Sequence, residues 1–132
     1  MPPTLFLTLD EVIQIHRGMI EGYGGGPGIR DMGLLQSAVA MPQAGLGGQF
    51  LHADLFEMAA AYLFHIVLNH PFMDGNKRVG AMAAFTFLKL NGFTLTVPEP
   101  EFEEHVRGVA QGKLGKAAIA EWLRNHSKRD RN

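Results

Sequence analysis

The sequence predicts a single all-α domain, a bundle of about six helices, and three observations support this fold class. The chain has 132 residues, a length that suits one domain with a full hydrophobic core. Apolar residues make up 46% of it, which is typical of globular proteins and not of disordered ones. Two long segments, 54–69 and 76–91, are apolar on nearly every helical face, as the central helices of a bundle are.

The first third of the chain predicts two helices separated by a glycine-rich loop. Thr8 and Glu11 match a capping box, and apolar residues follow at helical spacing. The glycine-rich stretch 23–28 ends this helix in a loop. Asp31 is a candidate N-cap for a short second helix, which should end before Pro42.

The middle of the chain predicts a flexible connection and then the two central helices. Residues 43–53 are rich in glycine and lack a helical period, so we expect a loop or a small hairpin there. The apolar segment that follows should be helical as far as Asn69, because Pro71 interrupts it. The second apolar segment should be a helix closed by Gly92.

The C-terminal part predicts short, separate elements. They are an extended piece at 93–97 and two amphipathic helices at 101–110 and 116–125. Residues 127–132 are polar, and we expect a frayed tail there. The predicted domain therefore spans residues 1–126.

Charge and composition argue against several classes of function. The formal net charge is −1, so direct binding of nucleic acid or of an anionic membrane through a general positive charge is not expected. No segment offers about 18 consecutive apolar residues, and the N-terminus lacks the basic and apolar regions of a signal peptide. The sequence has no cysteine, which excludes disulfides and thiolate metal sites and fits a reducing cytosol. We therefore expect a cytoplasmic protein without a membrane segment.

The stretch between the two apolar segments, residues 70–78, concentrates the chemically active side chains, and we call it the elbow. It contains an imidazole, a carboxylate, a glycine, an amide and two adjacent cations. Gly75 lets the backbone turn sharply, so the amides of residues 75–77 should lie at the start of the next helix. Free amides and the helix dipole attract anions at such an end. The elbow is therefore predicted to be an anion site.

The side chains of the elbow suit phosphate chemistry. Arg78 can bind two oxygens through its planar fork, while Lys77 acts as a point charge. Asp74 suits Mg²⁺, which usually takes one or two carboxylates together with phosphate oxygens. His70 is a natural general base, because histidine is the side chain that most often changes charge near neutral pH. Together these groups predict transfer of a phosphate-containing group to a hydroxyl.

Each of these residues also has a structural interpretation. A lone histidine at a helix end is more often structural than catalytic. Asp74 and Gly75 alone would be an ordinary turn. Residues 76–78 alone would be a helix start with solvated charges, although cations in a first turn oppose the helix dipole. That local conflict is a modest indication of a bound anion.

Structural interpretations are also favoured for other parts of the sequence. Phe72 is expected to be a core plug that fixes the elbow. The loop 24–28 matches neither the dinucleotide fingerprint nor the Walker A pattern, so an ordinary turn is favoured. His65 is expected to be buried and hydrogen-bonded. Surface positions are expected for the four histidines that lack partners at metal-binding spacing: His16, His52, His105 and His126.

The elbow resembles the Fic/Doc superfamily, and most closely its death-on-curing (Doc) toxin branch. The superfamily pattern is His-x-Phe-x-Asp/Glu-Gly/Ala-Asn-Gly/Lys-Arg. It is matched at each fixed position, by His70, Phe72, Asp74, Gly75, Asn76, Lys77 and Arg78. The likeness extends over nearly the whole chain, and residues 23–31 resemble the early loop of Doc-like proteins.

The resemblance implies a six-helix fold, Mg-ATP as the donor and a protein hydroxyl as the acceptor. It implies that His70 is the base for that hydroxyl and that Asp74 binds Mg²⁺. It assigns the nucleotide to Phe72, Gly75, Asn76, Lys77 and Arg78, the last two with a catalytic role as well.

Lys77 bears on which part of ATP is transferred. In Fic AMP-transferases its position is usually glycine, and an additional arginine falls where Ala81 stands. Doc-type toxins carry lysine there and are understood to transfer the γ-phosphate, which favours a kinase acting on a threonine of elongation factor Tu and arresting translation. Gly75, however, is the AMP-transferase version, and Met82 replaces an asparagine of the best-known Doc pattern. Nucleotidyl transfer therefore stays open, as does a catalytically inactive binding module.

The resemblance also implies a partner. Residues 43–53 match in position the flap over the family's active site, where an acceptor segment would dock by backbone pairing. Fic enzymes are often restrained by a helix with the pattern Ser/Thr-x-x-x-Glu-Gly/Asn, which is not found in this sequence. Restraint would then come from a Phd-like antitoxin of a type II toxin–antitoxin system, whose C-terminal segment folds onto an apolar groove of the toxin.

Overall fold

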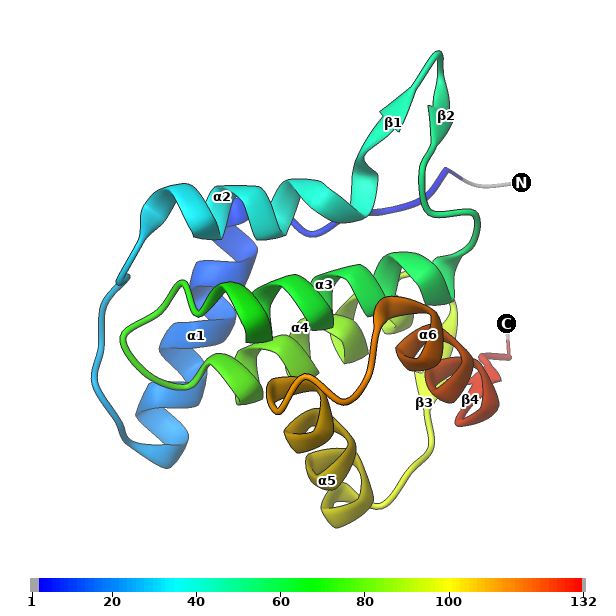
Figure 1. The fold of residues 1–132 in the computed structure, drawn as a ribbon. Helices are drawn as coiled ribbons and strands as arrows, with labels where there is room; N and C mark the ends of the chain where they lie inside the picture. The colour runs from blue at the N-terminus through cyan, green and yellow to red at the C-terminus, as the bar shows by residue number, and fades with distance from the viewer. Residues whose placement is uncertain (1–2, 132) are drawn as a thin grey trace.

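Two apolar helices, α3 (Leu55–Asn69) and α4 (Asn76–Leu90), form the centre of the fold in a computed structural model that describes residues 3–131 (Figure 1). They approach closely because position 80 of α4 is glycine. A Cβ there would lie 2.7 Å from Val67 Cγ2 of α3. The largest fully buried side chains, Tyr62, Phe72 and Phe87, lie on or beside this pair.

Four further helices surround the central pair in the described part of the chain. They are α1 (Leu9–Tyr23), α2 (Met32–Ala40), α5 (Glu99–Ala110) and α6 (Lys116–Asn125). In Figure 1, α2 lies above α3, α1 crosses behind the pair, and α5 and α6 lie below. A 3₁₀ turn, η1 (Met41–Gln43), follows α2 directly. The predicted all-α bundle of six helices is confirmed.

The predicted N-caps of α1 and α2 are also confirmed. The Thr8 hydroxyl accepts from the Glu11 amide and the Glu11 carboxylate accepts from the Thr8 amide, so the capping box is complete. Asp31 caps α2 by accepting from the Leu34 amide at 2.9 Å. α5 begins at Glu99, earlier than expected, because a proline in the first turn suits a helix start. Within residues 3–131, none of the helices has the length and apolar character that crossing a bilayer requires.

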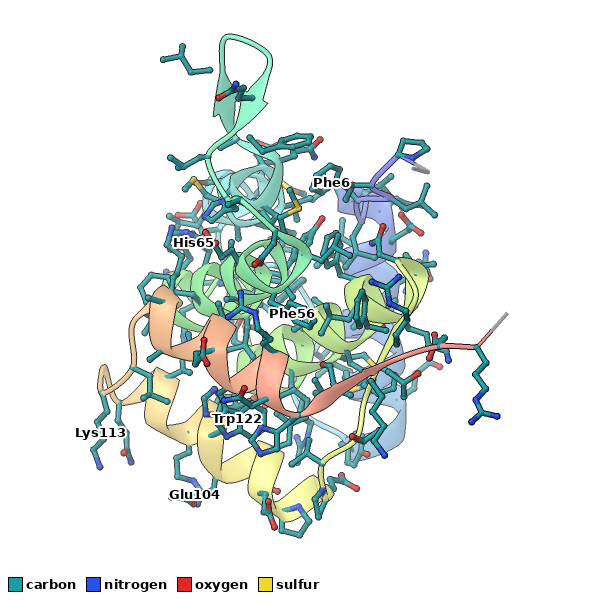
Figure 2. The ribbon with its side chains drawn as sticks, turned by 90° about the vertical axis from the view of Figure 1, so that its right-hand side faces the viewer. Phe6, Phe56, His65, Glu104, Lys113 and Trp122 are labelled. Atoms are coloured by element: carbon teal, nitrogen blue, oxygen red, sulfur yellow. The ribbon has the colours of Figure 1, made fainter. Side chains whose placement is uncertain are left out.

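Residues 43–53 form the expected small hairpin, but not over the elbow. β1 (Gly45–Leu46) pairs with β2 (Gln49–Phe50) across two glycines with positive φ, 61° and 81°, as a tight two-residue turn requires. The hairpin projects from the molecule near the N-terminal end of α3, whereas the elbow follows its C-terminal end (Figures 1 and 2). Because α3 has 15 residues, these ends are about 22 Å apart. The flap position taken from the family resemblance is therefore corrected.

The C-terminal segment is part of the fold. β3 (Phe93–Leu95) pairs antiparallel with β4 (Ser127–Arg129). Just beyond, Asp130 accepts hydrogen bonds from Lys89 Nζ at 3.2 Å and from the Thr94 hydroxyl. The expected fraying is therefore wrong for residues 127–130, because partners far away in the sequence hold them. Residue 132 of the predicted tail, and residues 1 and 2 of the predicted domain, lie outside the described residues.

Candidate active site

The elbow begins with an unusual backbone conformation at His70. α3 ends there, and His70 adopts φ 54° and ψ 49°, the left-handed region. It is the one non-glycine residue with positive φ among residues 3–131. Such conformations are disfavoured for residues with a Cβ, and they persist where surrounding contacts enforce them, often at functional sites.

Asn76 and Phe72 close the elbow into a fixed loop. The Asn76 side chain is buried, where its Oδ1 accepts from the Phe72 amide at 2.9 Å and its Nδ2 donates to the Phe72 carbonyl at 3.1 Å. Phe72 is fully buried, so the expected core plug is confirmed. Because the Asn76 side chain is buried and engaged, a ligand would meet this residue through its backbone amide.

The start of α4 has the geometry of an anion site. Gly75 has φ 80°, which provides the predicted sharp turn, and it is the N-cap without a side-chain capping bond. The first backbone bond of the helix runs from the Val79 amide to the Gly75 carbonyl at 2.9 Å. The amides of residues 76–78 have no acceptor among residues 3–131. These amides lie at the positive end of the helix dipole, where an anion would be stabilised.

The Asp74 carboxylate is held in its ionised form. Its Oδ2 accepts from the Gly26 amide at 3.3 Å and its Oδ1 from the Gly75 amide at 2.8 Å. These two hydrogen bonds, and to a smaller extent the positive charge of Arg78, hold the pKa of Asp74 below its usual value. No group of three or more His, Asp or Glu side chains that could hold a metal is present among residues 3–131. A cation at Asp74 would therefore take its other ligands from a bound phosphate and water, as Mg²⁺ commonly does.

The early glycine-rich loop packs against the elbow. A Cβ at position 25 would lie 2.7 Å from Asp74 Oδ2, so glycine is needed for this close approach. The Met73 amide donates to the Gly28 carbonyl at 3.1 Å, and Ile29 pairs with Phe72 as an isolated antiparallel bridge. The interpretation of residues 24–28 as an ordinary turn is therefore incomplete. Their glycines allow the backbone to pack against the candidate metal ligand.

His16 of α1 supports the elbow from inside the fold. Its ring stacks on Phe72 with centroids 4.0 Å apart, and Nε2 lies 3.0 Å from the Asp74 carbonyl oxygen. Since that oxygen can only accept, Nε2 is the donor. His16 is buried, so the expected surface position is wrong. Its spacing of one helical turn from the buried Val12 was a sequence signal for an inward-facing side chain.

The other histidines lie outside the elbow. His52 and His65 both face Lys116 at the start of α6. Their Nε2 atoms lie 3.4 and 3.2 Å from the Lys116 Nζ. His52 is buried, contrary to expectation, whereas His65 is half-buried and hydrogen-bonded. His105 and His126 stack on the two-ring system of Trp122. Figure 2 shows Trp122 between α5 and α6.

A cavity of about 670 Å³ opens beside the elbow. One wall carries the predicted site residues, all of them except Phe72: His70, Asp74, Gly75, Asn76, Lys77 and Arg78. Another part of the lining, which the sequence did not indicate, comes from α5 and includes Phe102, Glu103, Val106 and Arg107. This volume is within the range of small-molecule sites, and the cavity combines an apolar side with convergent polar groups.

Tyr23 is a further cavity residue that the sequence did not identify. The Arg78 guanidinium lies over its ring, 4.6 Å from the centroid. Tyr23 is 59% exposed, so this cation–π contact lies at the mouth of the cavity. The contact keeps Arg78 beside the free amides of α4 without neutralising its charge.

The chain is similar to known proteins over most of its length. A family model described as the Fic/DOC family matches residues 6–88, which include the early loop and the whole elbow. The Protein kinase doc of Escherichia phage P1 is 34% identical over 115 residues, which is 87% of this chain and 90% of that protein. The Toxin Doc of Mycolicibacterium smegmatis is 47% identical over 73 residues, 55% of this chain and 56% of that protein. The chain therefore belongs to the Fic/DOC family.

Proposed function

We propose that this protein is a Doc-type kinase that transfers the γ-phosphate of Mg-ATP to a protein hydroxyl. The observation that carries the proposal is the shared cavity wall of His70, Asp74 and Lys77 at the uncapped start of α4. This wall supports a reading in which a base, a metal carboxylate and an anion cradle surround one space that is large enough for a nucleotide. The name of the phage P1 relative, Protein kinase doc, supports the same activity.

In the proposed reaction His70 takes the proton of the acceptor hydroxyl as its oxygen attacks the γ-phosphorus. The bond between the γ-phosphorus and the β,γ-bridging oxygen breaks, and ADP leaves with the electron pair of that bond. The residues present fit Mg²⁺, held by Asp74 and by phosphate oxygens, and the ion would neutralise charge on the phosphates. Lys77, Arg78 and the amides of residues 76–78 would bind the remaining phosphate oxygens.

Lys77 is the reason for favouring γ-phosphate transfer over nucleotidyl transfer. Its exposed side chain lines the cavity directly at the start of α4, so it occupies space and adds charge where a glycine would leave the cradle open. The competing observation is Gly75, which has φ 80°, because glycine at this position is the version that the resemblance associates with AMP-transferases. AMP transfer is therefore the alternative outcome of the test below.

We further propose that the acceptor is a threonine of elongation factor Tu, so that the reaction arrests translation in the cytoplasm. A Phd-like antitoxin would restrain the activity by docking its C-terminal segment on the toxin, in a groove that involves α1. The name Toxin Doc of the second relative supports this toxin–antitoxin setting.

ATP labelled at either the α- or the γ-phosphate separates the candidate reactions. The purified protein, Mg²⁺ and elongation factor Tu are incubated with each label, with His70→Ala as the matched control. Transfer of the γ-label alone, strongly reduced in the control, is the expected result. Transfer of the α-label would establish nucleotidyl transfer instead, and transfer of neither label would favour an inactive binding module.

A further inference from the structure

Arg30, in the loop between α1 and α2, binds the backbone directly behind the candidate base. Its Nε donates to the His70 carbonyl at 2.6 Å, and its Nη2 donates to the Asn69 carbonyl at 2.9 Å. Its own amide donates to the Pro71 carbonyl at 2.7 Å. One residue thus accounts for three consecutive carbonyls where α3 ends.

These contacts act on the residue with the least favourable backbone conformation. The last carbonyls of a helix lack intrahelical partners and lie at the negative end of its dipole, so a guanidinium there is doubly favourable. His70 has a Cβ and would ordinarily avoid positive φ. The fork of Arg30 binds the carbonyls of the two peptide planes before and after the His70 Cα. The orientation of these two planes sets φ and ψ of His70.

We propose that Arg30 is a positioning residue that holds His70 in the left-handed conformation and so aims its imidazole into the cavity. Arg30 does not itself line the cavity, so it acts through His70 and not on the nucleotide. The kinetic part of this inference rests on the proposed function, whereas the conformational part does not.

The kinetic test is Arg30→Gln, which keeps a donor but loses the charged fork. The expected result is a fall in kcat on the order of tenfold to a hundredfold, with the KM for ATP within about twofold of wild type. Arg30→Lys should recover part of kcat, because it restores the charge at the helix end but not both hydrogen bonds. Arg17→Gln, an exposed α1 arginine that contacts Gln14, should leave both parameters unchanged. Equal kcat in wild type and Arg30→Gln, or a loss that appears mainly in KM, would overturn the inference.

A double variant shows whether Arg30 acts through His70. In a His70→Ala background, Arg30→Gln should cause no further loss of rate, because the side chain it positions is gone. A further loss of the same size as in the wild-type background would assign Arg30 a separate role and overturn the inference.

A conformational readout is independent of activity. The three-bond coupling between the amide proton and Hα of residue 70, measured by NMR and read together with the intraresidue NOE between the same two protons, gives φ with its sign, because these protons lie closest at positive φ. Wild type should report positive φ, and both Arg30→Gln and the more conservative Arg30→Lys should shift toward negative φ. If wild type transfers no phosphate, the proposed function fails and this coupling alone decides the inference. An unchanged coupling in both variants overturns it in either case.

Discussion

At the residue scale, the two principal side chains of the elbow are controlled in different ways. Asp74 is fixed through its carboxylate, by the amides of Gly26 and Gly75. His70 is fixed through its backbone, and its imidazole remains exposed. A metal ligand benefits from a fixed, ionised carboxylate, whereas a base needs access to an incoming hydroxyl. The contacts therefore match the roles proposed for each residue.

Replacement of Asp74 by asparagine should weaken the Mg²⁺-dependent binding of ATP. The substitution keeps the size and one oxygen of the side chain but removes the charge that attracts the cation. Calorimetry should show at least about a tenfold loss of affinity for Mg-ATP, while ATP in EDTA should bind both proteins alike. Asp10→Asn, at an exposed position of α1, is the control and should bind like wild type. Equal affinities for Mg-ATP would remove Asp74 from the metal site.

The pH dependence of this binding follows from the hydrogen bonds to Asp74. They stabilise the charged form, so the pKa of the carboxyl lies below its usual value and the charge persists as the pH falls. The difference in Mg-ATP affinity between wild type and Asp74→Asn should therefore persist until the pH is below the normal range for aspartate titration. Loss of this difference at a higher pH would contradict this assignment.

Tyr23 should contribute to nucleotide binding through its ring and not through its hydroxyl. Tyr23→Phe keeps the face under Arg78, whereas Tyr23→Leu removes the cation–π contact. Because the contact is exposed, its loss should cost about 0.5–1 kcal/mol, which corresponds to roughly a two- to fivefold rise in the KM for ATP. Steady-state kinetics should show Tyr23→Phe close to wild type. An equal defect in both variants would point to the hydroxyl instead.

At the element scale, the close contact of α3 with α4 determines where the elbow lies. Gly80→Ala should destabilise the protein, since the new methyl group would meet Val67 Cγ2 at 2.7 Å and the Leu63 carbonyl oxygen at 3.3 Å. Overpacking of this kind costs about 1–3 kcal/mol. Chemical denaturation should therefore show a lower midpoint, and Val67→Ala in the same chain should restore part of the loss.

Gly18→Ala is the matched control for this substitution. Gly18 is also helical, but a Cβ there would meet nothing within 4 Å. Alanine should raise the free energy of unfolding by about 0.5–1 kcal/mol through helix propensity. If both alanine variants gain stability, close packing at position 80 is not limiting.

The contact between α5 and α6 should weaken in acid. Burial first, and then the nearby His126, lower the pKa of His105 to about 4 from its ordinary value of 6.5. Between these values the unfolded chain binds the proton more readily than the folded chain does. Stability should therefore fall as the pH drops from 6.5 towards 4. In His105→Phe, which keeps an aromatic ring against Trp122, the fall should be smaller.

Thermal unfolding between pH 7 and pH 4.5 measures this effect. The variant should not be fully insensitive to pH, because burial and the charge of Lys116 also lower the pKa of His65 to about 4. Parallel curves of melting temperature against pH for the two proteins would show that His105 does not titrate in this way.

At the scale of the whole molecule, sequence patterns identify the elements that are determined locally. The apolar period of residues 116–125 matches α6 from end to end, and the capping box at Thr8 marks the start of α1. The elbow is equally local, since one turn, one helix start and nine consecutive residues define it. The hydrogen bonds within it, from Asn76 to Phe72 and from the Gly75 amide to Asp74, join residues at most four positions apart.

The features that the sequence does not reveal depend on partners far along the chain. β4 is polar and becomes a strand only because β3 offers it an edge. Arg30 and His16 read as ordinary polar residues until the fold brings them to residues 70 and 74, about forty to sixty positions away. The α5 wall of the cavity is amphipathic like any surface helix, and its second role appears only once the elbow faces it.

Expression of the whole protein in a bacterial host should slow growth, because phosphorylation of an abundant translation factor would arrest protein synthesis. His70→Ala should relieve the arrest by removing the base, and Asp74→Ala by removing the metal ligand. Both side chains are exposed, so these changes should leave the fold intact, as circular dichroism can verify. Arg17→Gln, outside the cavity, should remain as inhibitory as wild type. Incorporation of labelled amino acids should fall before growth stops. If both elbow variants arrest growth as strongly as wild type, the inhibition does not come from chemistry at this site.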